Sequence, residues 1–225
     1  MHLIIENLRR FWLRWFSDVD TKMLCRAKGV LHVGAHTGQE RDRYRSAGLK
    51  VIWFEAIPEI FNQLHCNIRG YKNQVALNYL LTDSDGEVYD FNISSNNGMS
   101  SSILALGDHK DIWPGVRYNS KIKVVGRSFS EVAKVESLVL DCYDCLVMDT
   151  QGSELLVLKG MGDHLKRFRF IKTEAADFEA YIGCCTVNEL KIFLNNHGFH
   201  EYFRELQVTH PSKGAYYELY FQRMT

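Results

Sequence analysis

Carboxylate side chains follow four apolar segments of the sequence, each near the point where the segment ends. Glu55 follows KVIWF, Asp83 follows QVALNYLLT, Asp149 follows CLVM and Glu174 follows RFIKT. If these segments are parallel strands of one sheet, the carboxylates meet at the edge where open α/β sheets bind ligands. Carboxylates gathered there favour a cationic ligand, and one of them could accept the proton of a bound hydroxyl group.

A turn with two glycines precedes these carboxylates, in VLHVGAHTGQE at residues 30–40. Gly34 and Gly38 let backbone N–H groups face a ligand, although such glycines also serve plain packing of a strand on a helix. Glu55 ends the next segment, where an acid accepts hydrogen bonds from ribose in nucleoside-binding folds. A dinucleotide enzyme would show GxGxxG, and the acid Glu40 in the first helical turn disfavours phosphate. The pattern therefore indicates a nucleoside without phosphates, which points to S-adenosylmethionine.

Strands and helices alternate along the chain that carries these residues. The predicted strands are GVLHVGA, KVIWFEA, QVALNYLLTD, CLVMDTQ, RFIKTEA, HEYFRELQV and AYYELYFQRM. GEVYDFNIS and KIKVVGRS are expected to be extended pieces around a loop rich in Ser, Asn and Gly. The predicted helices are GQERDRYRSAG, PEIFNQLHCNIR, SELLVLKGM and TVNELKIFLNNHG. This order predicts an α/β fold with a doubly wound, mostly parallel seven-stranded sheet and a terminal antiparallel pair. By analogy, that is the layout of class I methyltransferases.

The composition is that of a globular chain without net charge. Lys+Arg and Asp+Glu each number 27, which argues against a general nucleic-acid binder because such a protein needs a basic surface. Cys142, Cys145, Cys184 and Cys185 could supply four zinc ligands, but Cys145 opens an apolar strand and adjacent cysteines are poor tetrahedral partners. We expect free thiols and no metal. No secretory signal is visible, so we expect a cytoplasmic protein.

The N-terminal segment, residues 1–27, is expected to be an amphipathic helical appendage to one domain over residues 28–225. LIIENLRRFWLRWFSD alternates large apolar residues with arginines and is too short and too charged to span a bilayer. We expect it to pack on its own domain or on a second copy of the chain, which would give a homo-oligomer. Contact with a membrane surface is the alternative.

Several segments together resemble the FkbM-type methyltransferase family. They are VLHVGAHTGQE, VIWFEAIPE, LLTDSDGEVYDFNIS, SSSIL, VMDTQGSELLVLKG and YIGCCTVNELKIFLNNHGF. The resemblance runs from about Val30 to the C-terminus, and MDTQGSELLVLKG is its most specific part, being similar to the family's IDVEG-x-E-x-x-VLKG. It implies methylation of hydroxyl groups, often on sugars or natural products, with S-adenosylmethionine as donor.

Three positions depart from the family's pattern. His32 stands in place of an Asp, His36 in place of an Asn, and Gln151 in place of a Glu. The first change removes an acidic contact to the methionine ammonium, a role that Asp149 could take over.

The resemblance implies a set of donor-binding residues: Gly34, Ala35, His36, Gly38, Glu55, Ala56, Asp83, Ser100, Ser101, Ser102 and Asp149. The backbone of the glycine turn would hold the methionine moiety, Glu55 the ribose and Asp83 the adenine amino group. The segment NNGMSSSIL would close over the donor, with a polar surface turn as the alternative.

A weakly acidic hydroxyl acceptor needs a base near the donor. Asp149 is the first candidate, with His36 and Glu174 as alternatives, and a donor-binding or helix-capping role for Asp149 stays equally open. TEAADFEAY offers acceptors and an aromatic face to a carbohydrate, although a solvated acidic turn explains it almost as well.

Three functions remain in competition. The favoured one is an S-adenosylmethionine-dependent O-methyltransferase acting on a sugar or glycan acceptor, with no nucleic acid as partner. The alternatives are a nucleic-acid methyltransferase, which would need a basic face, and a donor-binding module with the same fold but no catalysis.

Overall fold

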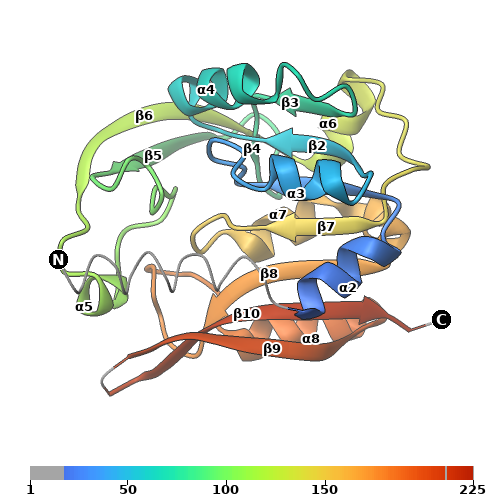
Figure 1. Ribbon diagram of the computed structural model, residues 1–225. Helices are drawn as coiled ribbons and strands as arrows, with labels where there is room; N and C mark the ends of the chain where they lie inside the picture. Colours follow the sequence, from blue (N-terminus) through green and yellow to red (C-terminus); the bar gives the residue numbers. More distant parts are fainter. Residues whose placement is uncertain (1–17, 211, 225) are drawn as a thin grey trace, which may run out of the picture.

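A seven-stranded sheet forms the centre of the computed structural model, which describes residues 18–210 and 212–224 (Figure 1). Its strand order is β3-β2-β1-β7-β8-β10-β9. The strands are β1 (Gly29–Val33), β2 (Lys50–Phe54), β3 (Gln74–Leu77), β7 (Cys145–Met148), β8 (Phe170–Ala176), β9 (Phe199–His210) and β10 (Gly214–Arg223). β1, β2, β3, β7 and β8 are mutually parallel, while β10 is antiparallel to both β8 and β9. The predicted fold class is confirmed.

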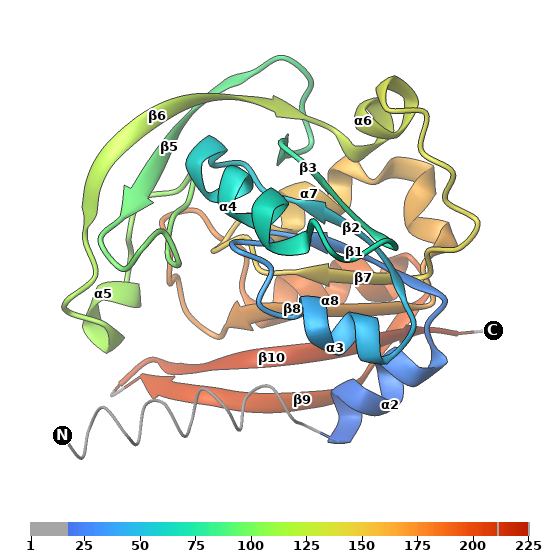
Figure 2. The same cartoon turned by 45° about the horizontal axis from the view of Figure 1, so that its top comes forward.

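Helices cover both faces of this sheet (Figures 1 and 2). One face carries α2 (Asp18–Arg26), α3 (Arg41–Ser46) and α4 (Pro58–Ile68), and the other carries α6 (Phe129–Val135), α7 (Glu154–Gly160), the 3₁₀ helix η1 (Gly162–Arg167) and α8 (Val187–Asn196). In β1, Leu31 and Val33 pack on the second set, while Val30 packs on the first. Successive side chains of a strand point to opposite faces, so a strand covered on both faces is mostly apolar.

Local signals set the ends of two helices as the sequence predicted. Pro58 occupies the first turn of α4, where its missing N–H costs nothing. In front of α8, the Thr186 side chain accepts a hydrogen bond from the backbone N–H of Glu189, whose carboxylate accepts one from Thr186 in return. This capping box fixes the start of α8.

The strand predicted over residues 74–83 is wrong, because it is divided in two. β3 ends at Leu77, and the side chain of Asn78 then donates hydrogen bonds to the carbonyl oxygens of Glu55, at 2.7 Å, and Ala56, at 3.2 Å. The chain leaves the main sheet here. Asp83 therefore does not end a strand of the main sheet, and its side chain is exposed.

A second sheet of three strands takes up the chain after this break. β4 (Leu80–Leu81) pairs parallel with β6 (Tyr118–Arg127), and β6 pairs antiparallel with β5 (Val88–Ser94). β5 and β6 form a long arm that reaches past α4 toward the short helix α5 (His109–Ile112) (Figure 2). The segment between β5 and α5 lies at the carboxyl edge of the main sheet, which brings it to the site described below.

Of the helical segment predicted over residues 1–27, residues 1–17 lie outside the described residues, and the described part forms α2 up to Arg26. This helix packs into the domain: Met23 and Leu24 are buried in one cluster with strand residues of β1 and β2. No helix in the described part of the chain is long and apolar enough to cross a membrane.

Candidate active site

A cleft of about 320 Å³ opens at the carboxyl ends of the parallel strands. Its volume falls within the range of small-molecule sites. The predicted site residues that line it are Gly34, Ala35, His36, Glu55, Ala56, Ser100, Ser101, Asp149 and Glu174. Gly38, Ser102 and Asp83 do not line it.

The two glycines of the first turn have different tasks. Gly34 has φ +78°, and a Cβ atom there would lie 1.9 Å from the carbonyl oxygen of Asp149. Gly34 thus lets the ends of β1 and β7 come into contact at the cleft. A Cβ atom at Gly38 would instead meet the side chain of Leu64 on α4 at 2.6 Å. Gly38 therefore allows the turn to pack on α4, and Gly34 allows the two strand ends to meet at the cleft.

Glu55 is buried at the end of β2 and orders the turn beside it. Its Oε2 atom accepts a hydrogen bond from the backbone N–H of His36, and its Oε1 atom accepts one from that of Ile57, both at 2.8 Å. Burial raises the pKa of Glu55 to about 7, although these N–H donors act in the opposite direction. A carboxylate oxygen can accept two hydrogen bonds, so each keeps capacity for a ligand hydroxyl.

His36 connects the glycine turn to the loop after β5. Its Nδ1 atom lies 2.9 Å from the amide nitrogen of Gln39, and its Nε2 atom lies 2.8 Å from the carbonyl oxygen of Asn97. An amide nitrogen can only donate, so Nδ1 is the acceptor. The proton is therefore on Nε2, which donates a hydrogen bond to the carbonyl oxygen of Asn97. Both ring nitrogens are engaged, and His36 would have to break a hydrogen bond to act as a base.

The serine loop, residues 95–102, is buried at Ser100, Ser101 and Ser102, so this part is not a plain surface turn. The backbone N–H of Ser100 donates to the side chains of Ser94, at 3.0 Å, and Asn96, at 3.2 Å. The hydroxyl group of Ser102 donates to the carbonyl oxygen of Gln151 at 2.8 Å. The loop is thereby joined to the turns after both β1 and β7.

Asp149 follows β7 directly and exposes its carboxylate at the cleft. Its Oδ1 atom accepts a hydrogen bond of 2.5 Å from the Gln151 amide, whose oxygen accepts one of 2.5 Å from the hydroxyl group of Tyr181. Gln151 has φ +54°, and the buried Glu154 carboxylate shapes this turn by accepting the backbone N–H groups of Thr150 and Gly152. Gln151 can link an acceptor to a donor because an amide is both, whereas a Glu would repel Asp149.

Glu174 lies inside β8, two residues before its end at Ala176, and not at the strand end as predicted. It is directly opposite Glu218 in the β8–β10 ladder, and both residues line the cleft. Because Met148 pairs with Thr173, Glu174 lies level with Asp149 along the strands, but it is half-buried whereas Asp149 is exposed.

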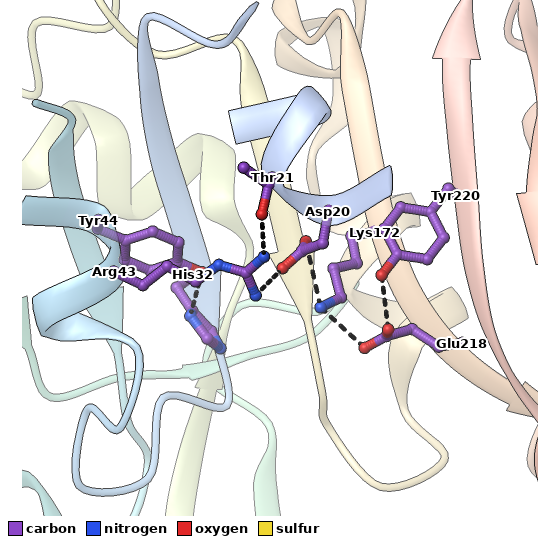
Figure 3. A network of polar contacts seen from close by, with 8 residues as sticks. All are labelled: Asp20, Thr21, His32, Arg43, Tyr44, Lys172, Glu218 and Tyr220. Carbon is purple, nitrogen blue, oxygen red and sulfur yellow. Dashed lines mark hydrogen bonds and ion pairs between the residues drawn. The ribbon is translucent and has the colours of Figure 1, made fainter. Parts of the chain in front are cut away.

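A buried ionic network lies at the base of the cleft, and the sequence did not predict it (Figure 3). The Nζ atom of Lys172 on β8 lies 2.8 Å from Glu218 Oε1 on β10 and 3.4 Å from Asp20 Oδ1 on α2. Asp20 also pairs with Arg43 of α3, and Tyr220 donates to Glu218 at 2.6 Å. Burial alone would lower the pKa of Lys172, but Glu218 and Asp20 raise it above its ordinary value. The sequence did contain a signal for this network, because Lys172 interrupts the apolar strand RFIKTEA and Glu218 interrupts AYYELYF.

His32 is buried beside this network and is neutral. Its ring stacks on Trp53 at 4.9 Å between centroids, and its Nδ1 atom is 3.0 Å from the hydroxyl oxygen of Tyr44. Burial, with a smaller effect of Lys172, lowers the pKa of His32 to about 3. His32 therefore brings no charge to the cleft at neutral pH.

Aromatic side chains form another part of the cleft lining, which the sequence did not reveal. Trp113, next to α5, lies 4.5 Å from His109 and 5.4 Å from Tyr216 between ring centroids, and all three line the cleft. Trp113 is 36% exposed, whereas His109 and Tyr216 are buried. The exposed indole offers a flat apolar face to a ligand.

No group of three or more His, Cys, Asp or Glu side chains suited to a metal ion occurs within residues 18–210 and 212–224. The six cysteines are free thiols.

The family model of the methyltransferase FkbM domain matches residues 32–201. The chain belongs to the FkbM methyltransferase family. One curated relative of this FkbM chain, 2-O-methyltransferase NoeI of Sinorhizobium fredii (strain NBRC 101917 / NGR234), is 26% identical over 162 residues. That match covers 68% of this chain and 65% of NoeI, so the chain spans less than two thirds of that relative.

Among solved structures, this FkbM chain is similar to magnesium protoporphyrin IX methyltransferase (ChlM) from Synechocystis PCC 6803 with bound S-adenosylmethionine. The TM-score is 0.51 at 13% identity, covering 92% of this chain and 77% of ChlM. At such low identity the likeness shows the fold, which is that of class I methyltransferases. Family and fold together give S-adenosylmethionine as the cofactor.

The residues of the cleft fit this cofactor. Gly34 lets the turn after β1 lie against the Asp149 backbone at the cleft, and Glu55 can accept ribose hydroxyl groups. Beyond Glu55 the wall is apolar, which suits an adenine ring, and it consists of Ile57, Ile60, Leu80 and Phe91. Asp83 lies outside this wall.

Proposed function

We propose that the protein is an S-adenosylmethionine-dependent O-methyltransferase acting on a hydroxyl group of a sugar or glycan. The observation that carries the proposal is Asp149, exposed in the cleft directly after β7 and held by the Gln151 amide. The bound cofactor supplies a methyl group on a cationic sulfur atom. The task left to the protein is to orient donor and acceptor and to receive the acceptor's proton.

Glu55 and the turn beside it would hold the nucleoside. The backbone N–H groups of His36 and Ile57 fix both carboxylate oxygens, so ribose would meet acceptors that are already oriented. The apolar wall that includes Ile57 would cover the adenine ring, and the backbone from Gly34 to His36 would lie along the methionine moiety.

Asp149 is the best placed of the three predicted bases. His36 uses both ring nitrogens in hydrogen bonds, and Glu174 is half-buried opposite Glu218, whereas Asp149 is exposed. Asp149 would take the acceptor's hydroxyl proton as the new oxygen–carbon bond forms. The Gln151–Tyr181 pair would keep the carboxylate oriented, because the amide donates to it from a fixed position.

Trp113 supports a sugar as acceptor. Its exposed indole borders the same cleft as Asp149, and the electron-rich face of an indole suits the C–H face of a sugar ring. Glu174 could accept hydrogen bonds from further hydroxyl groups. The name of the relative NoeI, a 2-O-methyltransferase, agrees with a hydroxyl acceptor.

The test compares Asp149→Asn with the wild type in methyl transfer from labelled S-adenosylmethionine onto a panel of glycans. The amide keeps the side chain's shape but cannot take a proton, so turnover should fall about 10²- to 10⁴-fold. Donor affinity, measured by calorimetry with S-adenosylhomocysteine, should stay near the wild-type value.

Asp83→Asn is the matched control, since Asp83 is an exposed carboxylate outside the cleft. Unchanged turnover in Asp149→Asn would remove Asp149 from the reaction. Methyl incorporation into RNA or DNA, but not into glycans, would overturn the proposed acceptor.

A further inference from the structure

Glu40 lines the cleft and has a buried carboxylate oxygen without a hydrogen-bond partner in the described structure. The residue precedes α3 and lines the cleft together with Gly34 and Asp149. Its Oε2 atom is buried and has no hydrogen-bond partner, and its side chain does not cap α3. A buried polar atom left unpaired costs free energy, so a ligand group that pairs with it would explain why it is there.

The charge that this position would favour is positive. Burial raises the pKa of Glu40 to about 8, and among its charged neighbours Lys172 acts to lower it while Asp149 and Asp20 act to raise it. A cation placed against Oε2 would favour the ionised carboxylate and form a charge-assisted hydrogen bond.

The two positions that the sequence offered for this ammonium group, 32 and 149, are less suited to bind it. His32, which stands where the family has an Asp, is neutral and bonded to Tyr44. Asp149 is exposed and already accepts the Gln151 amide.

We infer that Glu40 binds the α-ammonium group of the donor's methionine moiety and replaces the acid that position 32 lacks. The inference rests on the proposed donor site, in which the turn after β1 holds the methionine moiety. That turn runs from Gly34 directly to Glu40, so the carboxylate lies at the end of the backbone that would hold the amino-acid part of the donor.

The test measures binding of two ligands to the wild type and to Glu40→Gln by calorimetry. One ligand is S-adenosylhomocysteine, and the other is its analogue with hydrogen in place of the α-amino group. The wild type should prefer the first by about 10- to 150-fold, the size of one charge-assisted hydrogen bond. Glu40→Gln should lose most of this preference while its affinity for the analogue stays within about threefold of the wild type.

Asp149→Asn serves as the comparison variant, since the sequence offered Asp149 for the same role. It should keep the preference for the α-amino ligand. If Asp149→Asn loses the preference and Glu40→Gln keeps it, the inference is overturned. Failure of the wild type to bind S-adenosylhomocysteine at all would instead overturn the proposed function. Thermal melting of each variant shows whether an altered affinity reflects loss of fold.

Proton release provides a second readout that a merely structural Glu40 would not change. With a pKa of about 8, the unliganded Glu40 is mostly protonated at pH 7, and binding an ammonium should ionise it. The wild type should therefore release up to about one more proton per bound S-adenosylhomocysteine than Glu40→Gln at pH 7, and the difference should vanish toward pH 9.

The groups that face Glu40 are Lys172 of β8, Asp149 after β7, Asp20 of α2 and Tyr44 of α3. All of them, and Glu55, are kept in Glu40→Gln, so the difference in proton release isolates Glu40. Equal proton release in the two proteins would contradict the inference.

Discussion

Lys172→Met should destabilise the fold strongly, because Lys172 joins two buried carboxylates at the base of the cleft. Its Nζ atom lies 2.8 Å from Glu218 and 3.4 Å from Asp20, whose side chains are only 8% and 5% exposed. Methionine matches the length of the lysine stem but removes the charge. Each carboxylate keeps other contacts, among them Arg43 for Asp20 and Tyr220 for Glu218.

The size of the effect follows from this geometry. Removing one partner of a buried ion pair costs about 3–5 kcal/mol, and the remaining partners place the expectation at the lower end, about 3 kcal/mol. For a domain of this size each kcal/mol lowers the melting temperature by about 2–4 °C, so Lys172→Met should melt about 6–12 °C below the wild type. The folded pKa of Lys172 lies above its ordinary value of 10.5, so its stabilisation is fully present below that pH and is lost only above it. The deficit should therefore persist from about pH 6 to 9.

The assay is urea unfolding and thermal melting of Lys172→Met beside Lys166→Met. Lys166 makes a 2.6 Å ion pair with Asp163, but the side chains are 74% and 92% exposed, so its loss should cost less than about 1 kcal/mol. If both variants unfold at the wild-type midpoint, the buried network contributes nothing to stability and the reasoning fails.

Three further substitutions test the cleft. Glu55→Gln should weaken S-adenosylhomocysteine binding about 10- to 100-fold, because a charged acceptor contributes about 1.5–3 kcal/mol, and unchanged affinity in calorimetry would disprove the ribose assignment. Gly34→Ala should lower the free energy of unfolding by well over the 1–2 kcal/mol of a left-handed alanine, since its Cβ atom would lie 1.9 Å from the Asp149 carbonyl oxygen. Gly48→Ala is its control in urea unfolding, with φ +70° but nothing within 4 Å of the new Cβ atom; equal costs would contradict the close approach at Gly34. Trp113→Ala should raise the acceptor KM at least about tenfold and spare donor affinity, whereas an unchanged KM would place the acceptor elsewhere.

The sequence predicted the parts of the site that depend on a single strand and its end. Glu55 and Asp149 directly follow β2 and β7, because uninterrupted apolar runs mark strands covered on both faces. The prediction that Asp83 ends a strand of the main sheet was wrong because of a tertiary contact. Asn78 turns the chain out of the sheet by binding carbonyl groups after β2, and nothing in the apolar run around it records those contacts.

Residues whose partners lie far away in the sequence could not be predicted from the sequence. Asp20 lies in the segment expected to be an appendage, yet it pairs with Lys172 of β8 and Arg43 of α3. Glu40 served in the sequence only as an argument against phosphate. Its unpaired Oε2 atom is visible only once α3 has packed on the sheet.

The charges at the base of the cleft explain why substitution of Lys172 should change stability, whereas substitution of Glu40 should change ligand binding. In the network of Figure 3, Lys172 and Arg43 face Asp20 and Glu218, so two cations balance two carboxylates with or without a donor. Glu40 lies outside this balance, and its ionisation would add a negative charge that a bound ammonium could neutralise. Loss of Lys172 should therefore appear in the stability of the unliganded protein, and loss of Glu40 in the preference for an α-amino ligand. If Lys172→Met melts at the wild-type temperature but loses that preference, the network is part of the ligand site, and Lys172 and Glu40 do not have separate roles.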